Sequence, residues 1–254
     1  MFFVLDLRKF KFIFLFLCII AIALIIFLCT TPGKAIKAVN TTHCNTVYLT
    51  FDDGPSGVTE KVLEVLTNHD IKATFFIIGE TNSDAASLYN RIISEGHALG
   101  LHSYTHNMGH IYSSKDNYVK DFERLRDFVA QTTGAQPKIC RMVGGSYTCP
   151  KWLRTQILDY FESQGYSCYD WDIDPKDSGA YALEPKLLAN NVIKAAQKKL
   201  DQDLVVLLHD DSLRKTLPDA LEIIIPYFKE QGYKFDILSQ DTPLYGSRAL
   251  LQPN

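Results

Sequence analysis

The chain has 254 residues, of which 46% are hydrophobic and 22% charged, and its formal net charge is -3. This composition excludes a disordered chain and provides enough apolar residues for one sizeable core. The mean hydropathy of -0.05 excludes a polytopic membrane protein but is compatible with a single anchor. Residues 39–254 carry 21 basic and 28 acidic residues. An acidic body without a basic cluster argues against nucleic acid as a partner.

An apolar span lies near the N-terminus. Residues 12–29 contain no charged side chain, and a stretch of this length just crosses a bilayer core of about 30 Å. Arg8, Lys9 and Lys11 precede the span, so the positive-inside rule places residues 1–11 in the cytoplasm and the rest of the chain outside. We therefore expect one transmembrane helix. A cleaved signal peptide is the alternative, although its apolar region is usually only about 7–15 residues long.

Residues 30–45 are polar and contain Pro and Gly, which is typical of a linker. Strand-like and helix-like patterns then alternate through residues 46–254, which we expect to form one domain. The expected strands are 46–51, 72–79, 97–102, 138–143, 166–173, 204–208 and 233–238. The expected helices are 58–66, 84–94, 116–132, 151–164, 185–200 and 217–230. About seven βα units predict a parallel sheet wrapped by helices, either a barrel or a doubly wound sheet, with its chemistry at the C-terminal strand ends.

Two adjacent acids, Asp52 and Asp53, directly follow the first expected strand. Neighbouring side chains on a regular strand point to opposite faces. One carboxylate could therefore bind a metal while the other acts as a base. The alternative is an Asp-Gly turn with both acids solvated.

His102 and His106 follow the third expected strand with a spacing of four residues. This spacing suits two ligands on one helical turn. Together with one Asp they would form a two-His-one-carboxylate set for zinc or another divalent metal. We expect His110 not to be a ligand, because it would need a further turn of the same helix. His43, His69 and His97 are interpreted as structural.

Three further strand ends carry polar residues. Arg141 precedes Gly144 and Gly145, whose backbone N–H groups could approach a ligand closely, although a glycine-rich turn with a surface Arg is an equally plain interpretation. Four acids lie in residues 169–177, some of them in a solvated loop. His209 follows five apolar residues, which favours a catalytic or buried position.

Four cysteines lie beyond the apolar span: Cys44, Cys140, Cys149 and Cys168. Four cysteines permit three pairings, and the absence of a CxxC pair argues against a zinc ribbon. Cys140 and Cys149 flank a turn-rich stretch. They could close a loop through a disulfide, or all of these thiols could be free and buried.

Taken together, these segments resemble the polysaccharide deacetylase family, also called the NodB-homology domain of family-four carbohydrate esterases. The motifs that carry the resemblance occur in order: TFDDGP at 50–55, KATFFIIG at 72–79, HSYTH at 102–106, RMVGGS at 141–146, WDIDPKD at 171–177 and LLHD at 207–210. The resemblance runs in order from about Thr46 to Leu238, and five ordered motifs besides KATFFIIG make coincidence improbable. The family fold is a distorted (β/α) barrel, which agrees with about seven βα units.

The resemblance implies a role for each matched residue. Asp52 is implied to be the general base and Arg141 to orient it. His209 is implied to be the general acid, paired with Asp177. The remaining implied roles are metal binding by Asp53, His102 and His106, oxyanion binding by the Gly144 N–H, and contact with the acetyl methyl by Leu207.

The resemblance also implies a divalent metal cofactor, Zn²⁺ in the first place, with Co²⁺, Ni²⁺ or Mn²⁺ as alternatives. Two departures from the family pattern stand out. Met142-Val143 replaces the usual Pro-Pro, and Ser178 replaces a Trp that would wall the acetyl pocket. We expect a more open pocket as a result.

The implied function is hydrolysis of N-acetyl groups on a glycan polymer by a monomer anchored in a bacterial cell membrane, with its domain outside. A tethered domain reaches only nearby polymer, which favours peptidoglycan. Pro55 favours N-acetylglucosamine, because the muramic-acid branch tends to have Tyr there. An O-acetyl esterase acting on xylan or another glycan, and an inactive glycan-binding module, are the alternatives.

Overall fold

The computed structural model describes residues 45–79, 83–199 and 202–243. The chain divides into two units, 1–42 and 43–254, and all described residues belong to the second. The expected cytoplasmic segment and membrane anchor lie outside the described residues, as does the linker up to position 44. Among the helices in the described ranges, none is both long and apolar enough to cross a membrane.

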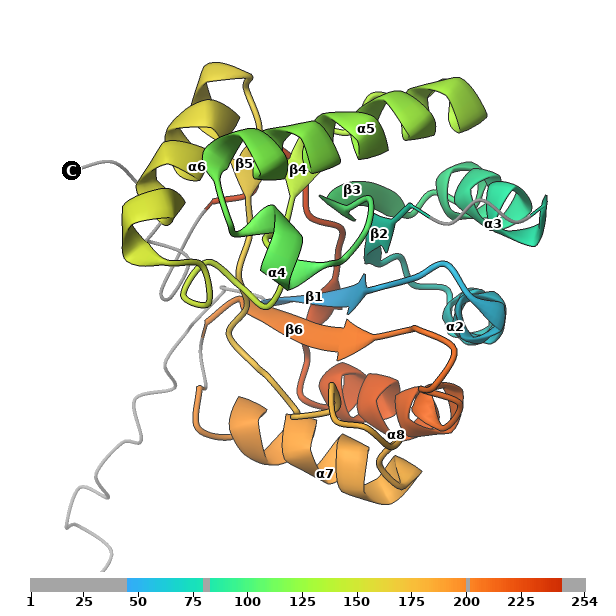
Figure 1. The fold of residues 1–254 in the computed structure, drawn as a ribbon. Coiled ribbons are helices and arrows are strands. Elements are labelled where there is room, and N and C mark those ends of the chain that lie inside the picture. The colour runs from blue at the N-terminus through green and yellow to red at the C-terminus, as the bar shows by residue number, and fades with distance from the viewer. Residues whose placement is uncertain (1–44, 80–82, 200–201, 244–254) are drawn as a thin grey trace, which may run out of the picture. The chain divides into compact units, whose positions relative to one another are not determined.

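One parallel sheet of seven strands forms the centre of the domain (Figure 1). The strands are β1 (Thr46–Asp52), β2 (Thr74–Ile78), β3 (Ala98–Ser103), β4 (Ile139–Cys140), β5 (Ser167–Cys168), β6 (Leu204–His209) and β7 (Lys234–Phe235). Their order is β5-β4-β3-β2-β1-β6, and β7 pairs with the start of β1. All strands therefore point the same way, and their C-terminal ends meet at one edge.

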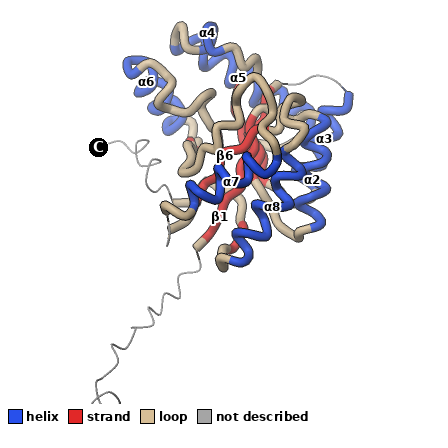
Figure 2. Tube along the Cα trace, turned by 90° about the horizontal axis from the view of Figure 1, so that it is seen from below, coloured by secondary structure: helices blue, strands red, loops and turns tan. Residues whose placement is uncertain are grey.

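Helices surround this sheet, which lies between them in both views (Figures 1 and 2). They are α2 (Gly57–Asn68), α3 (Ser83–Ser94), α4 (Met108–Ile111), α5 (Lys115–Thr133), α6 (Lys151–Ser163), α7 (Pro185–Ala196) and α8 (Leu217–Glu230). Six of them occupy the ranges that the apolar periodicity predicts. The short α4 has no counterpart in the prediction, because a single turn has no periodicity to detect.

Local side chains define where the longer helices begin. Ser56 accepts a hydrogen bond from the Val58 N–H, and the Thr59 hydroxyl accepts one from the Ser56 N–H, which together form a capping box. Ser114 caps α5, and Gly134 ends it in the left-handed conformation with a φ of 74°. Ser56 follows the end of β1 closely, whereas α4 lies between the end of β3 and Ser114.

A β-bridge connects the segment after β5 to β6. The expected strand 166–173 is only two residues long as β5, and the chain then crosses to β6, where Ile173 pairs with Val206. The Leu207 N–H donates to the Ile173 carbonyl oxygen at 2.9 Å. The six consecutive strands thus form a parallel half-barrel, and this crossing segment joins its two end strands. This arrangement favours the distorted barrel over the doubly wound sheet.

The core lies between the sheet and the helices. Residues 47–52 of β1 are all buried, as are Leu204–Leu208 of β6. Cys140, Cys149 and Cys168 are buried free thiols, so the suggestion of a disulfide loop between Cys140 and Cys149 was wrong. The β4–β5 register places Cys140 beside Cys168 and not beside Cys149, and a buried thiol packs as a small hydrophobic side chain. Cys44 lies outside the described residues.

Candidate active site

The two adjacent acids diverge because the strand ends between them. Asp52 is the last residue of β1, and Asp53 has a φ of 73°, in the left-handed region. Asp52 lies beside His209 in the β1–β6 register. This reversal turns the Asp53 carboxylate toward the histidines that follow β3, whereas the Asp52 carboxylate contacts Arg141.

Asp53, His102 and His106 form a cluster whose potential ligand atoms all lie within 4.8 Å of one another. Asp53 Oδ1 is 3.4 Å from His102 Nε2 and 3.0 Å from His106 Nε2. This buried oxygen has no partner that satisfies hydrogen-bond geometry. One carboxylate and two imidazoles are the donor set that zinc and similar divalent cations prefer. The cluster therefore fits a divalent metal, and His110 is not part of it.

The surroundings of this cluster set the protonation of each member. Burial acts to lower the pKa of His106, but the Asp53 hydrogen bond and charge raise it above its ordinary value. The His102 Nδ1–H donates to the Arg141 carbonyl oxygen at 2.8 Å, which leaves the Nε2 lone pair toward Asp53. Burial lowers the pKa of His102 below its ordinary value, although the carboxylates of Asp52 and Asp53 oppose this effect. Burial acts to raise the pKa of Asp53, but the close His106 ring and the positive charge of the histidines outweigh it and hold the pKa well below the usual range. A neutral imidazole and an ionised carboxylate are the forms that bind metal.

The expectation that His102 and His106 share a helical turn was wrong. His102 lies in β3, and His106 lies in the loop after it, with a φ of 52°. Asp121 of α5 holds this loop. Its Oδ2 accepts from the Ser103 hydroxyl at 2.6 Å and the Tyr104 N–H at 2.8 Å, and its Oδ1 accepts from the N–H and hydroxyl of Thr105 at 3.0 and 2.6 Å. A carboxylate from another element therefore replaces the helical turn as the means of bringing the two imidazoles together.

Sequence reasoning missed Asp121, although a signal was present. The residue lies on the same helical face as Tyr118, Phe122 and Leu125, and it is 8% exposed. An acid on the apolar face of an amphipathic helix needs partners, because a buried charge without hydrogen bonds is costly.

Arg141 is fully buried, so the alternative of a surface Arg in a glycine-rich turn was wrong. Its Nη1 donates to Asp52 Oδ1 at 2.8 Å and to the Thr50 hydroxyl at 2.7 Å. Its Nε and Nη2 donate to the carbonyl oxygens of Tyr169 and Asp170. The guanidinium thus has partners on three sides, and it holds the Asp52 carboxylate in one orientation.

His209 ends β6 and pairs with Asp177. Its Nδ1 is 2.8 Å from Asp177 Oδ1, and its backbone N–H donates to Asp177 Oδ2 at 3.0 Å. Burial acts to lower the pKa of His209, but the Asp177 hydrogen bond and charge and the charges of Asp52 and Asp53 raise it to about 9. The imidazole is therefore protonated at neutral pH, as a general acid must be.

These groups lie around one cavity of about 250 Å³. Its lining includes the metal cluster, Asp52 and His209, together with Gly144, Ser178 and Leu207. Arg141 and Asp177 are buried behind this lining. Gly144 has a φ of 68°, and Ser178 is exposed at the rim. All ten site residues expected from the sequence therefore lie in or directly behind one cavity.

Asp210 is a second acid that sequence reasoning did not single out. It is fully buried and accepts a hydrogen bond from the Thr59 hydroxyl, and its own N–H donates to the Asp52 carbonyl oxygen at 3.0 Å. A Cβ added to Gly54 would lie only 2.5 Å from its Oδ2. Burial raises the pKa of Asp210 to about 7, although the Thr59 hydrogen bond opposes the rise. Asp210 packs directly under the backbone that carries the acid pair.

Among the other histidines in the described ranges, two have structural contacts. His69 Nε2 lies 2.9 Å from Glu222, and His97 Nδ1 accepts the Ala73 N–H at 3.1 Å. His110 belongs to α4 and is exposed. His43 lies outside the described residues.

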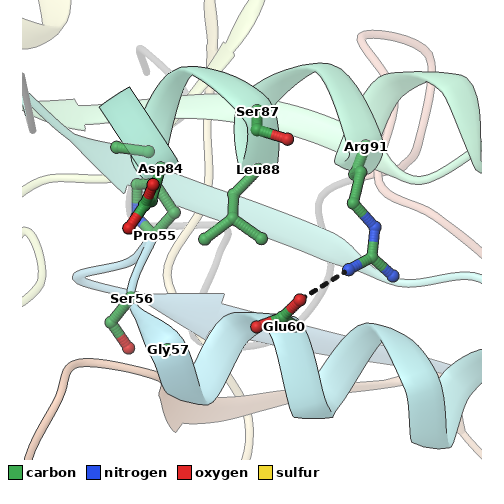
Figure 3. Close-up of a pocket in the computed structure, with 9 residues that line it drawn as sticks. Pro55, Ser56, Gly57, Glu60, Asp84, Ser87, Leu88 and Arg91 are labelled. Atoms are coloured by element: carbon green, nitrogen blue, oxygen red, sulfur yellow. Dashed lines mark ion pairs between the residues drawn. The ribbon is translucent and has the colours of Figure 1, made fainter. Parts of the chain in front are cut away.

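A separate hollow lies between α2 and α3 (Figure 3). Glu60 and Arg91 form an ion pair of 3.6 Å across it. None of the site residues expected from the sequence lines this hollow, and its exposed ion pair is of a kind that contributes little to stability.

Comparison with known proteins decides the family. Residues 39–161 match the polysaccharide deacetylase family model. The chain is 33% identical over 205 residues to a peptidoglycan-N-acetylglucosamine deacetylase of Bacillus cereus, with 77% of this chain and 70% of that protein covered. The chain belongs to the polysaccharide deacetylase family.

Solved structures of this family share the fold. The catalytic domain of a peptidoglycan N-acetylglucosamine deacetylase from Eubacterium rectale matches with a TM-score of 0.72 at 29% identity, covering 78% of this chain and 90% of that one. A family 4 acetyl xylan esterase from Clostridium thermocellum, in complex with a cobalt ion, matches with a TM-score of 0.62 at 26% identity, covering 76% and 88%. The fold shared with these structures therefore covers about three quarters of the chain.

Proposed function

We propose that this polysaccharide deacetylase is a metal-dependent amide hydrolase that removes acetyl groups from N-acetylglucosamine of peptidoglycan. The observation that carries the proposal is the common cavity. The Asp53–His102–His106 cluster faces it together with Asp52, which Arg141 holds from behind, and His209, which Asp177 holds from behind. A metal site polarises the carbonyl and activates water, a base takes the proton of that water, and an acid protonates the leaving amine, so these three groups together suffice for amide hydrolysis at neutral pH.

The chain's own residues divide the reaction between them. A divalent cation held by Asp53, His102 and His106 would polarise the amide carbonyl and acidify water, and Zn²⁺, Co²⁺, Ni²⁺ and Mn²⁺ all suit this donor set. Asp52, oriented by Arg141, takes the proton of the attacking water. The protonated His209, held by Asp177, donates its proton to the departing amine.

One backbone N–H and one apolar side chain complete the assignment of roles in the reaction. The Gly144 N–H is the donor for charge that develops on the carbonyl oxygen, since the glycine lines the cavity in a left-handed turn. Leu207 lines the same cavity from β6 and provides an apolar contact for the acetyl methyl group.

The proposed substrate rests on relatives named as peptidoglycan-N-acetylglucosamine deacetylases. Removal of an O-acetyl group from xylan or another glycan is the second candidate, because the same residues serve ester hydrolysis and the cobalt-bound relative is an acetyl xylan esterase. The leaving group of an ester is an alcohol, which needs protonation less than an amine does. The protonated His209, held by Asp177, therefore favours an amide substrate over an ester.

The test compares the two reactions on the purified protein with Zn²⁺ added. Acetate release and free-amine release are measured on peptidoglycan and on acetylated xylan. We expect equal amounts of acetate and amine from peptidoglycan. Acetate release from xylan alone would identify an esterase, and glycan binding without any acetate release would identify an inactive binding module.

We further propose that residues 12–29 anchor the protein in a bacterial cell membrane as a single pass, with the catalytic domain outside and acting as a monomer. The uninterrupted apolar span and the basic residues before it support this proposal. Fractionation of cells that express the full chain tests it. Membrane-bound protein of full length is expected, and a shortened protein in the medium would indicate a cleaved signal.

A further inference from the structure

Besides Val143, three large side chains line the proposed catalytic cavity without a part in the reaction: Met108, Tyr147 and Trp171. They come from three separate segments, namely the start of α4, the turn after Gly145 and the crossing between β5 and the Ile173 bridge. Tyr147 is 60% exposed. Large aromatic side chains usually bury most of their surface, and this one keeps an exposed ring at the mouth of the cavity, where a ligand can contact it.

The double glycine allows the rings to lie close to the reacting atoms. A Cβ added to Gly145 would lie 2.7 Å from Trp171 Cη2 and 2.8 Å from Tyr147 Cε1, and one added to Gly144 would lie 3.4 Å from Met108 Cε. Both aromatic rings therefore cover the backbone beside the Gly144 N–H. The Tyr147 and Trp171 rings meet at a centroid distance of 5.8 Å and an angle of 74°. Tyr147 is thus supported by a second ring while it keeps an exposed surface.

The chemistry of the ligand follows from this surface. A pyranose ring has a face of C–H groups that is apolar and a rim of hydroxyl groups that stays hydrated. An aromatic ring laid on that face removes apolar surface of both partners from water. Tyr also loses little rotamer freedom when it binds, because its side chain has only two χ angles.

We propose that Tyr147, supported by Trp171 and flanked by Met108, is a stacking subsite for a pyranose ring of the glycan, next to the sugar whose acetyl group enters the cavity. This inference rests on the proposed function and adds a residue that selects chain-like glycans over single sugars. Its position over Gly145 places the bound neighbouring sugar at the mouth of the catalytic cavity.

The test uses three variants of the full chain with Zn²⁺ added: Tyr147→Ala, Tyr147→Phe and the control Trp152→Ala. Trp152 is also 60% exposed but lies on α6 and does not line the cavity. We measure kcat and KM for the tetramer of N-acetylglucosamine. We also measure Kd for the same tetramer by calorimetry in an Asp52→Asn background, where the tetramer stays intact.

For Tyr147→Ala we expect KM and Kd to rise about tenfold, the loss of one well-covered apolar contact, with kcat within about twofold. Tyr147→Phe keeps the ring and should match the wild type, as should Trp152→Ala. Unchanged KM and Kd in Tyr147→Ala would overturn the proposed subsite. A decrease in kcat alone would overturn it too, as would a failure of the wild type to bind the tetramer. If the wild type bound the tetramer without releasing acetate, the proposed function would fail while the calorimetry still decided the subsite.

Discussion

Asp52 and Asp53 are neighbours in the chain, yet their surroundings assign them different tasks. Asp52 faces the Arg141 guanidinium at 2.8 Å, whereas Asp53 faces two imidazoles. We expect Asp52→Asn to retain the metal and to lose turnover by about 10²–10⁴-fold, the usual effect of removing a general base. Metal content by atomic spectroscopy and acetate release measure the two quantities. If Asp52→Asn lost the metal and Asp53→Asn retained it, Asp52 would be the metal ligand and Asp53 the general base.

Ser178 lines the cavity from an exposed position, and Tyr181, 87% exposed, does not cover it. Trp171 lines the same cavity, so Ser178 leaves a gap only at its own position, where the family pattern has a Trp. We expect Ser178→Trp to raise the preference for acetyl over propionyl, because a large aromatic side chain excludes the longer acyl group. The measurement is kcat/KM on N-acetyl and N-propionyl glucosamine oligomers. An unchanged ratio would mean that other residues form the acyl wall.

His209 provides a pH-dependent prediction for the metal-free protein. Its pKa of about 9 lies above the ordinary value of 6.5. Between these two pH values the folded state therefore keeps a proton that the unfolded state has already released. The resulting stability is present below pH 6.5 and is lost as the pH rises through about 9. In chelator-treated protein, NMR titration should give a lower pKa for His209 in Asp177→Asn than in the wild type. Equal values in the two proteins would show that the ion pair does not hold the proton.

At the scale of elements, α5 positions the loop that follows β3 and carries His106. Asp121 accepts four hydrogen bonds from residues 103–105 and so determines where His106 lies. An amide has one acceptor oxygen and a donor where the second carboxylate oxygen was. Asp121→Asn should therefore weaken metal binding by about 10–100-fold, as loss of a group that orients ligands typically does. Zn²⁺ affinity is measured by competition with a chromogenic chelator.

Asp116→Asn is the matched control, because Asp116 lies exposed in the first turn of the same helix. It should bind Zn²⁺ like the wild type. Wild-type affinity in Asp121→Asn would mean that the loop keeps its shape without the carboxylate, and that β3 alone positions the imidazoles.

At the scale of the whole molecule, the proposed metal joins the end of β1 to the segment after β3. A ligand that binds only the folded state stabilises it by about 2.7 kcal/mol at a hundred times its Kd. We expect excess Zn²⁺ to raise the free energy of unfolding of the wild type and of His110→Ala by about this amount. His102→Ala and His106→Ala should gain much less, because two ligands remain. Equal stabilisation of all four proteins in urea titrations would contradict the ligand assignment.

The order of elements and the candidate residues followed from the sequence alone. Apolar runs such as Leu204–Leu208 are buried strands, and residues 217–230 form a helix over the predicted range. Both patterns report local periodicity, which depends on neighbouring residues only. The ordered motifs likewise identified the polar residues that meet at the C-terminal strand ends, because parallel strands bring those ends to one edge.

Tertiary structure alone decided how these residues are held. Asp121 binds a loop 16 to 18 residues before it, Arg141 reaches Asp52 across 89 positions, and Ile173 bridges to β6. The left-handed backbone of Asp53 and His106 and the burial of Arg141 depend on these distant partners. Periodicity and spacing in the sequence carry no information about them, because a hydrogen bond between remote segments exists only once the sheet has brought those segments together.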